Sequence, residues 1–211
     1  MAFFVCRAAR CIHAAECVSR LTAVFDTAKR PWIQPGSAPA DAVAEVVAHC
    51  PTGALQYQRK DGGTAETAAD SSHVVLTPNG PLYVRGDVHI QTADGATQQE
   101  TRAALCRCGQ SANKPFCDNA HVAAGFTAAG SMAAGEVGVA EETAASPLRI
   151  TPAANGPLLL SGRFEIRSAD GQTLFRGSKA ALCRCGGSAN KPFCDGTHKR
   201  IGFVTEVDDA D

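Results

Sequence analysis

The residues of this chain that could do chemistry are its ten cysteines, six of which stand with histidines in two matching groups. In each group a Cys-x-Cys pair is followed after eight residues by a third cysteine, and after three more by a histidine. The groups are Cys106, Cys108, Cys117 and His121, and Cys183, Cys185, Cys194 and His198. Three thiolates and one imidazole form a complete four-ligand set. On ligand types alone, the set suits structural zinc and an iron–sulfur cluster equally.

The composition of the chain bears on where the protein resides and on which kinds of partner it could bind. The 20 basic and 21 acidic residues give a net charge of -1, so the chain lacks the basic stripe that nucleic-acid binding requires. No apolar stretch approaches the roughly 20 residues of a membrane helix, and the N-terminus lacks the order of a signal peptide. We therefore expect a cytoplasmic protein with no nucleic-acid or membrane partner. In that reducing compartment, closely spaced cysteines favour metal sites, and a secreted, disulfide-linked protein is the weaker alternative.

The chain repeats itself, which fixes its organisation. The matching segments are 79–86 with 155–162, 103–109 with 180–186, and 111–118 with 188–195. The sequence predicts an N-terminal module over 1–60 and two repeats over 73–128 and 147–211. Polar or Ala/Gly-rich linkers are expected over 61–72 and 129–146.

Periodicity indicates an α+β fold in which the repeats are β-rich. Apolar residues alternate with polar ones in segments 82–90 and 158–166, and Asp94-Gly95 and Asp170-Gly171 are turn signals. Residues 39–49 predict a short helix with valines on one face. Asp118 and Asp195 stand where an N-cap would begin a short helix carrying each histidine.

The segment Cys-Arg-Cys-Gly-x-Ser-Ala-Asn-Lys-Pro-Phe-Cys-Asp, followed by the histidine, resembles the signature of the CDGSH (NEET) iron–sulfur proteins, and it occurs twice. The resemblance implies a [2Fe–2S] cluster in each repeat, with the three cysteines and one histidine of each group as ligands. Asn119 stands where the family has glycine, a substitution that a left-handed backbone tolerates. By position alone, the Ser111 and Ser188 hydroxyls would donate hydrogen bonds to cluster sulfurs.

Tandem motifs also resemble the class in which two clusters lie near a two-fold axis. We therefore expect an intrachain pseudo-dimer whose halves pack their β faces together, in a chain that is monomeric. An imidazole ligand in place of a thiolate removes a negative charge and raises the reduction potential. Its second nitrogen can bind a proton, so electron uptake can couple to protonation.

The N-terminal module resembles the divergent single-cluster ferredoxins. Cys11 and Cys17 stand at the outer positions of a ferredoxin cysteine run, and Cys50-Pro51 resembles the distal ligand segment. Three cysteines favour a [3Fe–4S] cluster, and a [4Fe–4S] cluster would need His13, Cys6 or solvent as the fourth ligand. We expect Cys6 to be a small buried thiol on an edge strand, and His13 to lie beside the cluster rather than to bind it.

Taken together, these features predict a multi-cluster electron-transfer protein that serves redox protein partners. No nucleophile–base arrangement or phosphate loop indicates an enzyme. The alternatives are an iron–sulfur storage, sensing or transfer protein and a zinc-stabilised interaction module.

Overall fold

The computed structural model describes residues 2–132 and 146–205. The chain divides into two compact units, Met1–Thr67 and Ala68–Asp211, and the division falls within the segment 61–72 that the sequence marks as a linker. Most of the linker expected over 129–146 lies outside the described residues. Among the described helices, none is long and apolar enough to cross a membrane.

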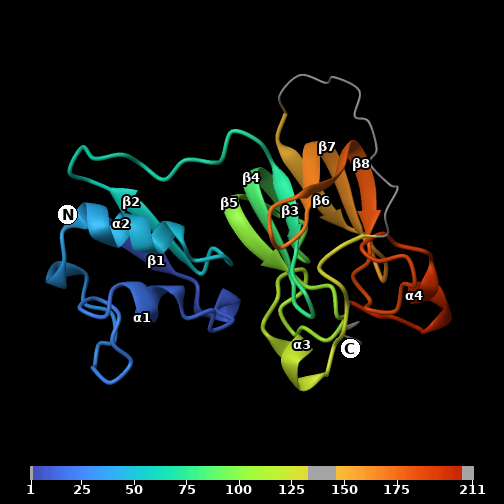
Figure 1. Ribbon diagram of the computed structural model, residues 1–211, viewed down its shortest axis with the longest axis horizontal. Coiled ribbons are helices and arrows are strands. Elements are labelled where there is room, and N and C mark those ends of the chain that lie inside the picture. The colour runs from blue at the N-terminus through green and yellow to red at the C-terminus, as the bar shows by residue number, and fades with distance from the viewer. Residues whose placement is uncertain (1, 133–145, 206–211) are drawn as a thin grey trace. The chain divides into compact units, whose positions relative to one another are not determined.

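The N-terminal unit is a two-stranded sheet with two short α-helices (Figure 1). Strands β1 (Ala2–Cys6) and β2 (Leu55–Arg59) pair antiparallel, which brings Cys6 opposite Leu55. The helices are α1 (Glu16–Arg20) and α2 (Ala40–Ala48), with 3₁₀ turns at Ala8–Arg10 and Pro35–Ser37. The helix predicted over 39–49 is thus confirmed.

A small apolar core holds this unit together. Val43, Val46 and Val47 of α2 are buried against Phe25 and Leu55. The spacing of the valines puts them on one helix face, so α2 can cover the core with one side and leave the other in water. Cys17 of α1 and Cys50, which follows α2, both pack against this core.

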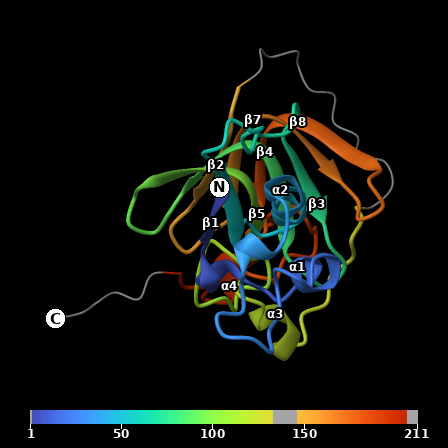
Figure 2. The same cartoon turned by 90° about the vertical axis from the view of Figure 1, so that its left-hand side faces the viewer.

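The C-terminal unit is a mixed six-stranded sheet with two one-turn helices (Figures 1 and 2). Its strands are β3 (His73–Leu76), β4 (Leu82–Gln91), β5 (Thr97–Leu105), β6 (Leu148–Pro152), β7 (Leu158–Arg167) and β8 (Thr173–Leu182). The helices α3 (Ala120–Ala123) and α4 (Thr197–Arg200) lie at the same end of the strands in both views.

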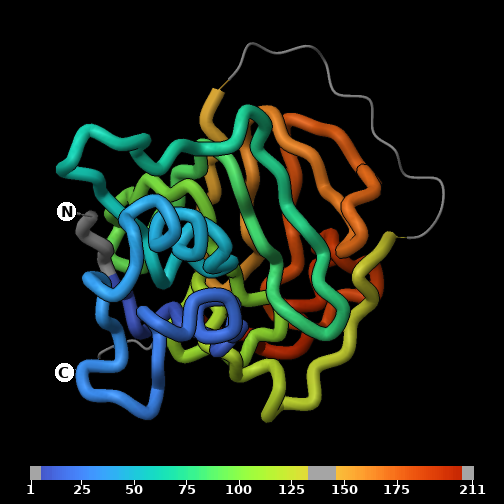
Figure 3. The backbone as a smooth tube through the Cα atoms, turned by 60° about the vertical axis from the view of Figure 1, so that its left-hand side comes forward, coloured from blue at the N-terminus to red at the C-terminus, as the bar shows by residue number. Residues whose placement is uncertain are grey.

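The two repeats are joined by an exchange of strand pairings. Within each repeat three strands pair antiparallel, β3–β4–β5 in the first and β6–β7–β8 in the second. Between repeats, β3 pairs parallel with β7, and β6 pairs parallel with β4. Figure 3 follows the green strands of the first repeat beside the orange strands of the second. The sequence predicts the strands but not these edge pairings.

Alternation of apolar and polar residues explains why both repeats share one core. Along β4 every second side chain, from Leu82 to Ile90, is fully buried, and the intervening ones are half-buried. Leu148, Leu158 and Ile166 of the second repeat are buried in the same cluster. Both repeats therefore contribute side chains to one apolar core.

The loops that carry the cysteines of the two repeats contact each other, and each loop has a glycine at the point of contact. Cys108 and Cys185 pair as an isolated antiparallel β-bridge. A Cβ on Gly109 would lie 2.7 Å from the carbonyl oxygen of Cys185, and a Cβ on Gly186 would lie 2.6 Å from that of Cys108. Both glycines have φ near +80°, so only glycine satisfies the backbone conformation and the close approach together.

We expect Gly109→Ala to lower the free energy of unfolding more than Gly95→Ala does. Both glycines have positive φ, so alanine costs about 1–2 kcal/mol in backbone strain at either position. Gly95 has no heavy atom within 4 Å of its would-be Cβ, whereas Gly109 would clash with the Cys185 backbone. Urea denaturation of the two variants measures the difference, and equal losses would contradict the contact between the loops.

Candidate metal centres

Each cysteine loop in the C-terminal unit closes on the end of the strand that precedes it. Cys106 donates its backbone N–H to the carbonyl of Pro115 at 2.9 Å, and Cys117 donates to Ala104 at 2.9 Å. The second repeat matches, with Cys183 N to Pro192 O and Cys194 N to Ala181 O, both 2.8 Å. The returning chain thereby brings the third cysteine back beside the Cys-x-Cys pair.

The four side chains of each group form two close pairs. Sγ of Cys106 lies 3.8 Å from Sγ of Cys108, and Sγ of Cys117 lies 3.4 Å from Nδ1 of His121. In the second repeat the corresponding distances are 3.8 Å for Cys183–Cys185 and 3.3 Å for Cys194–His198. Two ligands on one tetrahedral metal, with metal–sulfur bonds of about 2.3 Å and metal–nitrogen bonds of about 2.0 Å, stand about 3.5–3.8 Å apart. Each pair therefore has the separation of two ligands on one metal.

The pairs do not merge into a single four-ligand site. Across residues 2–132 and 146–205, no three histidine, cysteine or acidic side chains converge where one metal ion could be held. A single tetrahedral zinc would require all four ligand atoms of a group around one point. The geometry of each group fits two metals held by two ligands each.

A left-handed residue turns each histidine toward its cysteine. Asn119 has φ of 77° and Gly196 has φ of 81°, so the two loops have the same backbone despite the different residue. This confirms that asparagine replaces the glycine without changing the turn. The backbone N–H groups of Asn119 and Gly196 also point at Cys117 Sγ and Cys194 Sγ, at 3.4 and 3.5 Å. Such donors stabilise thiolates.

Asp118 and Asp195 precede the N-caps, which are Asn119 and Gly196, so the prediction that they occupy the N-cap position is wrong by one residue. They still fix the loop. Asp195 accepts the N–H of Thr197 at 3.0 Å and the N–H of Ala189 at 2.9 Å. These backbone donors hold its pKa well below the usual range. Asp118 makes the same two contacts in the first repeat.

The hydroxyls of Ser111 and Ser188 do not donate to sulfur. Ser111 donates to the carbonyl of Phe116 at 2.7 Å, and Ser188 donates to that of Phe193 at 2.7 Å. A hydroxyl has one proton, so the expectation of a hydroxyl–sulfur bond is wrong for these side chains. The backbone N–H of Ser111 takes that role instead, because it helps to lower the pKa of Cys106.

Burial and contacts between neighbouring thiols shift the pKa values of the cysteines in these groups. The hydrogen bond with Cys108 lowers the pKa of Cys106 to about 6, and the pKa of Cys108 is raised in return. Burial raises the pKa of Cys117 to about 11 and raises that of Cys183. At neutral pH the Cys106 thiol, with its lowered pKa, is therefore mostly ionised, whereas Cys108, Cys117 and Cys183, with raised pKa values, would lose their protons on metal binding.

The arginine inside each Cys-x-Cys pair fixes the ligand loop, a role that the sequence analysis missed. Arg107 is 3% exposed, donates to the carbonyl of Gly80 at 2.7 Å, and lies 5.6 Å from the ring centre of Phe126. The matching contacts in the second repeat are those of Arg184 with Gly156 at 3.0 Å and with Phe203 at 5.6 Å. The sequence does contain a signal for this contact, because the arginine and the later Gly-Phe pair occur in both repeats. Burial lowers the pKa of Arg107 to about 10.

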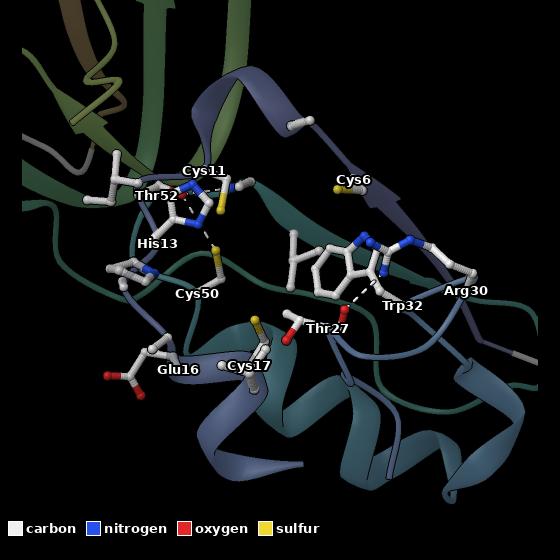
Figure 4. Close-up of a pocket in the computed structure, with 18 residues that line it drawn as sticks. Cys6, Cys11, His13, Glu16, Cys17, Thr27, Arg30, Trp32, Cys50 and Thr52 are labelled. Carbon is white, nitrogen blue, oxygen red and sulfur yellow. Dashed lines mark hydrogen bonds between the residues drawn. The ribbon is translucent and has the colours of Figure 1, made fainter. Parts of the chain in front are cut away.

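The N-terminal unit contains a cavity of about 620 Å³ that is lined by all four of its cysteines (Figure 4). Cys11, Cys17 and Cys50, the three predicted ligands, are therefore brought together. Cys6 lines the same cavity and is exposed, so the expectation that it is a buried packing thiol is wrong. Partial burial, and then the thiols of Cys11 and Cys50, raise the pKa of Cys6.

Two further side chains of this cavity bear on a cluster. His13 lines it, with its backbone in the left-handed region at φ of 57°. Thr52 Oγ1 lies 3.6 Å from Cys50 Sγ and accepts the N–H of Ala54, which fixes the turn after Cys50-Pro51. Thr52 was not predicted, although it follows the Cys-Pro signal directly.

Comparison with known proteins identifies both parts of the chain. The family described as iron-binding zinc finger CDGSH type matches residues 79–122 and 155–199. The family described as divergent 4Fe-4S mono-cluster matches residues 5–60.

Two curated relatives, both the uncharacterized protein YjdI, come from Escherichia coli strains K12 and O157:H7. Each is 36% identical over 50 residues, which is 24% of this chain and 66% of the relative. The chain thus spans about two thirds of the length of these relatives. It is an iron–sulfur protein with one N-terminal domain of the divergent 4Fe-4S mono-cluster family and two domains of the CDGSH family.

Proposed function

We propose that the chain is an electron-transfer protein with a [2Fe–2S] cluster in each CDGSH repeat and one further cluster in the N-terminal domain. The observation that carries this proposal is the pairing of ligand atoms, 3.8 Å for sulfur–sulfur and 3.3–3.4 Å for sulfur–nitrogen, in both repeats. A two-iron cluster needs two ligands on each iron, which is the arrangement these pairs offer. In this proposal the protein carries electrons for redox protein partners and acts on no substrate of its own.

The chain's own residues would set the properties of such clusters. The cluster, when bound, accepts and releases single electrons. Cys117 and His121 in the first repeat, and Cys194 and His198 in the second, would hold the iron that has the imidazole ligand. Because Nδ1 of each ring faces the cysteine, Nε2 is left to take a proton when an electron arrives. Backbone N–H groups directed at the thiolates would favour the reduced, more negative state.

We further propose that the two repeats form an intrachain pseudo-dimer. The reciprocal pairings of β3 with β7 and of β6 with β4 support it, because equivalent strands exchange partners. The contact of Cys108 with Cys185, which occupy equivalent positions, also supports it. In such a chain the contact between the two repeats is made internally, so we propose that it is monomeric.

For the N-terminal domain we propose a [4Fe–4S] cluster with Cys6 as the fourth ligand. The description of the matched family names a 4Fe-4S cluster, and Cys6 lines the same cavity as the other three cysteines. This changes the preference for three irons that followed from counting three cysteines. A [4Fe–4S] cluster takes one protein ligand for each iron, so four thiols spread around a cavity suit it.

A cluster storage or transfer protein is the second candidate. It is favoured by the exposure of the iron ligands in the second repeat, since Cys194 is half-buried whereas its counterpart Cys117 is 2% exposed. Incubation of the holoprotein with an apo-ferredoxin separates the two functions. Transfer of clusters faster than transfer of electrons would favour this second candidate.

We expect His198→Cys to lower the reduction potential of one [2Fe–2S] cluster by about 100 mV or more, because a thiolate adds a negative charge. The dependence of that potential on pH should flatten as well, since the ligand that takes the proton is gone. Redox titration at several pH values measures both effects. His73→Gln, in the same unit but outside the ligand groups, is the control. An unchanged slope in His198→Cys would contradict the ligand assignment.

We expect about eight irons per chain in protein prepared without oxygen, and a red-brown colour from sulfur-to-iron charge transfer. Cys6→Ser should reduce the count to about seven and produce the EPR signal of an oxidised three-iron cluster. His13→Ala should keep about eight irons, because its ring lies near the cluster without binding it. Seven irons in the unaltered protein would support a three-iron cluster and contradict this proposal. Loss of iron in His13→Ala, but not in Cys6→Ser, would identify His13 as the fourth ligand.

A further inference from the structure

The two CDGSH repeats have nearly identical ligand loops but differ in the residues that follow the histidine. After His121 the chain continues Val122-Ala-Ala124, whereas after His198 it continues Lys199-Arg-Ile201. Directly after the shared Gly-Phe pair, the first repeat has Thr127 and the second has Val204. The helices α3 and α4 have the same length and follow the same turn, so the difference lies in side chains and not in the backbone.

The residues that differ in the second repeat form an exposed surface, which we name the α4 patch: Lys199, Arg200, Ile201 and Val204. Ile201 is 54% exposed and Val204 is 62% exposed, which is unusual for large apolar side chains so close together. Arg200 donates to Thr197 Oγ1 at 2.7 Å, which fixes the guanidinium beside the helix. The patch therefore combines two exposed apolar groups with two cations.

The α4 patch lies directly against the second candidate cluster. Its first residue follows His198 in the chain. Ile201 Cδ1 would lie 3.1 Å from a Cβ placed on Gly187, a position that is itself 3.8 Å from Cys185 Sγ. Ligands from both ends of the group, Cys185 and His198, thus border the patch. Electron transfer falls off steeply with distance, so a partner seated here would be near its target.

The acidic group near the cations occurs in both repeats and so does not distinguish them. Asp195 is exposed, but both of its oxygens accept backbone N–H groups of its own loop. Asp118 does the same in the first repeat, so the carboxylate is common to both. Lys191 and Lys114 are also equivalent, each donating to a serine carbonyl. Among the described residues, Lys199 and Arg200 therefore add two positive charges that the first repeat lacks at Val122 and Ala123, and the acidic residues of segment 206–211 lie outside the described residues.

We propose that the α4 patch is the docking surface for an acidic redox protein, so that electrons enter and leave the C-terminal unit through the second repeat. This rests on the proposed electron-transfer function. An apolar centre beside cations fits a partner that has carboxylates around its own redox centre, and charge complementarity of this kind accelerates association. Two cations are too few for a nucleic-acid or membrane surface, which need longer basic stripes. The first repeat, which has alanines and a valine at these positions, would serve as an internal site.

The test is stopped-flow reduction of the oxidised holoprotein by a reduced, acidic plant-type [2Fe–2S] ferredoxin. One electron passes to the chain for each probe molecule that is reoxidised. The test variant is Lys199→Val/Arg200→Ala, which gives α4 the residues of α3 at these two positions. The control variant is Arg163→Ala/Lys179→Val, which removes the same charge from exposed positions on β7 and β8. Dithionite, a small reductant that needs no docking, reports whether each variant keeps reducible clusters.

We expect the second-order rate constant at low ionic strength to fall about tenfold in the test variant and to stay near the original value in the control. The rate should decrease with salt in the unaltered protein and become nearly independent of salt in the test variant. Dithionite should bleach all three proteins equally.

Equal rates in the test variant and the unaltered protein, with normal bleaching by dithionite, would overturn the docking surface alone. The docking surface is likewise overturned if the control variant slows as much as the test variant, because net charge would then explain the effect. Loss of binding to anionic vesicles in the test variant, with an unchanged rate, would assign the patch to a membrane and overturn the proposal. Failure of dithionite to bleach the unaltered protein would instead overturn the proposed function, and this inference with it.

Discussion

The return of each cysteine loop onto its own strand is the constraint on which the candidate clusters depend. Two backbone hydrogen bonds, Cys106 N to Pro115 O and Cys117 N to Ala104 O, extend β5 by one short turn of pairing. The same bonds occur after β8. Because they use main-chain groups, they fix the positions of the ligand residues whether or not a metal is bound. The close pairs of ligand atoms follow from this closure, and so does the position of the arginine that fills the loop.

Strand pairing between the two repeats is the second feature on which the C-terminal unit depends. A single repeat offers three strands with one apolar face and two open edges, which is a marginal structure in water. Pairing of β3 with β7 and of β6 with β4 covers the β3 and β6 edges and encloses one core, while β5 and β8 remain the outer strands of the sheet. The same arrangement brings Gly109 and Gly186 against the opposite loop. Stability of the sheet and proximity of the two ligand loops are therefore consequences of one geometry.

Much of this could be predicted from local sequence. Period-two alternation identified β4 and β7, the spacing of Val43, Val46 and Val47 identified α2, and the left-handed turn at Asn119 followed from its alignment with a glycine. Two of the failures depend on contacts distant in the sequence, and a third depends on local geometry. Pairing of β3 with β7 leaves no local signal, and neither does the position of Cys6, which β2 places at the cavity. For Ser111, the nearest acceptor in space is a carbonyl five residues away, and sequence position alone suggested the sulfur.

Duplication gives the chain two sites that can diverge while the ligands stay fixed. The side chains that determine the cluster type lie inside the loop and are constrained by it, whereas those one turn further along α3 and α4 face outward. Substitution there changes what can approach the site without changing the site itself. Cys117 is buried, and the residues after His121 are small or apolar, whereas Cys194 is half-buried, and the residues after His198 carry positive charge. Two sites with equivalent ligand sets in one chain can therefore differ in their access to other molecules, and this difference arises without any change in the ligands.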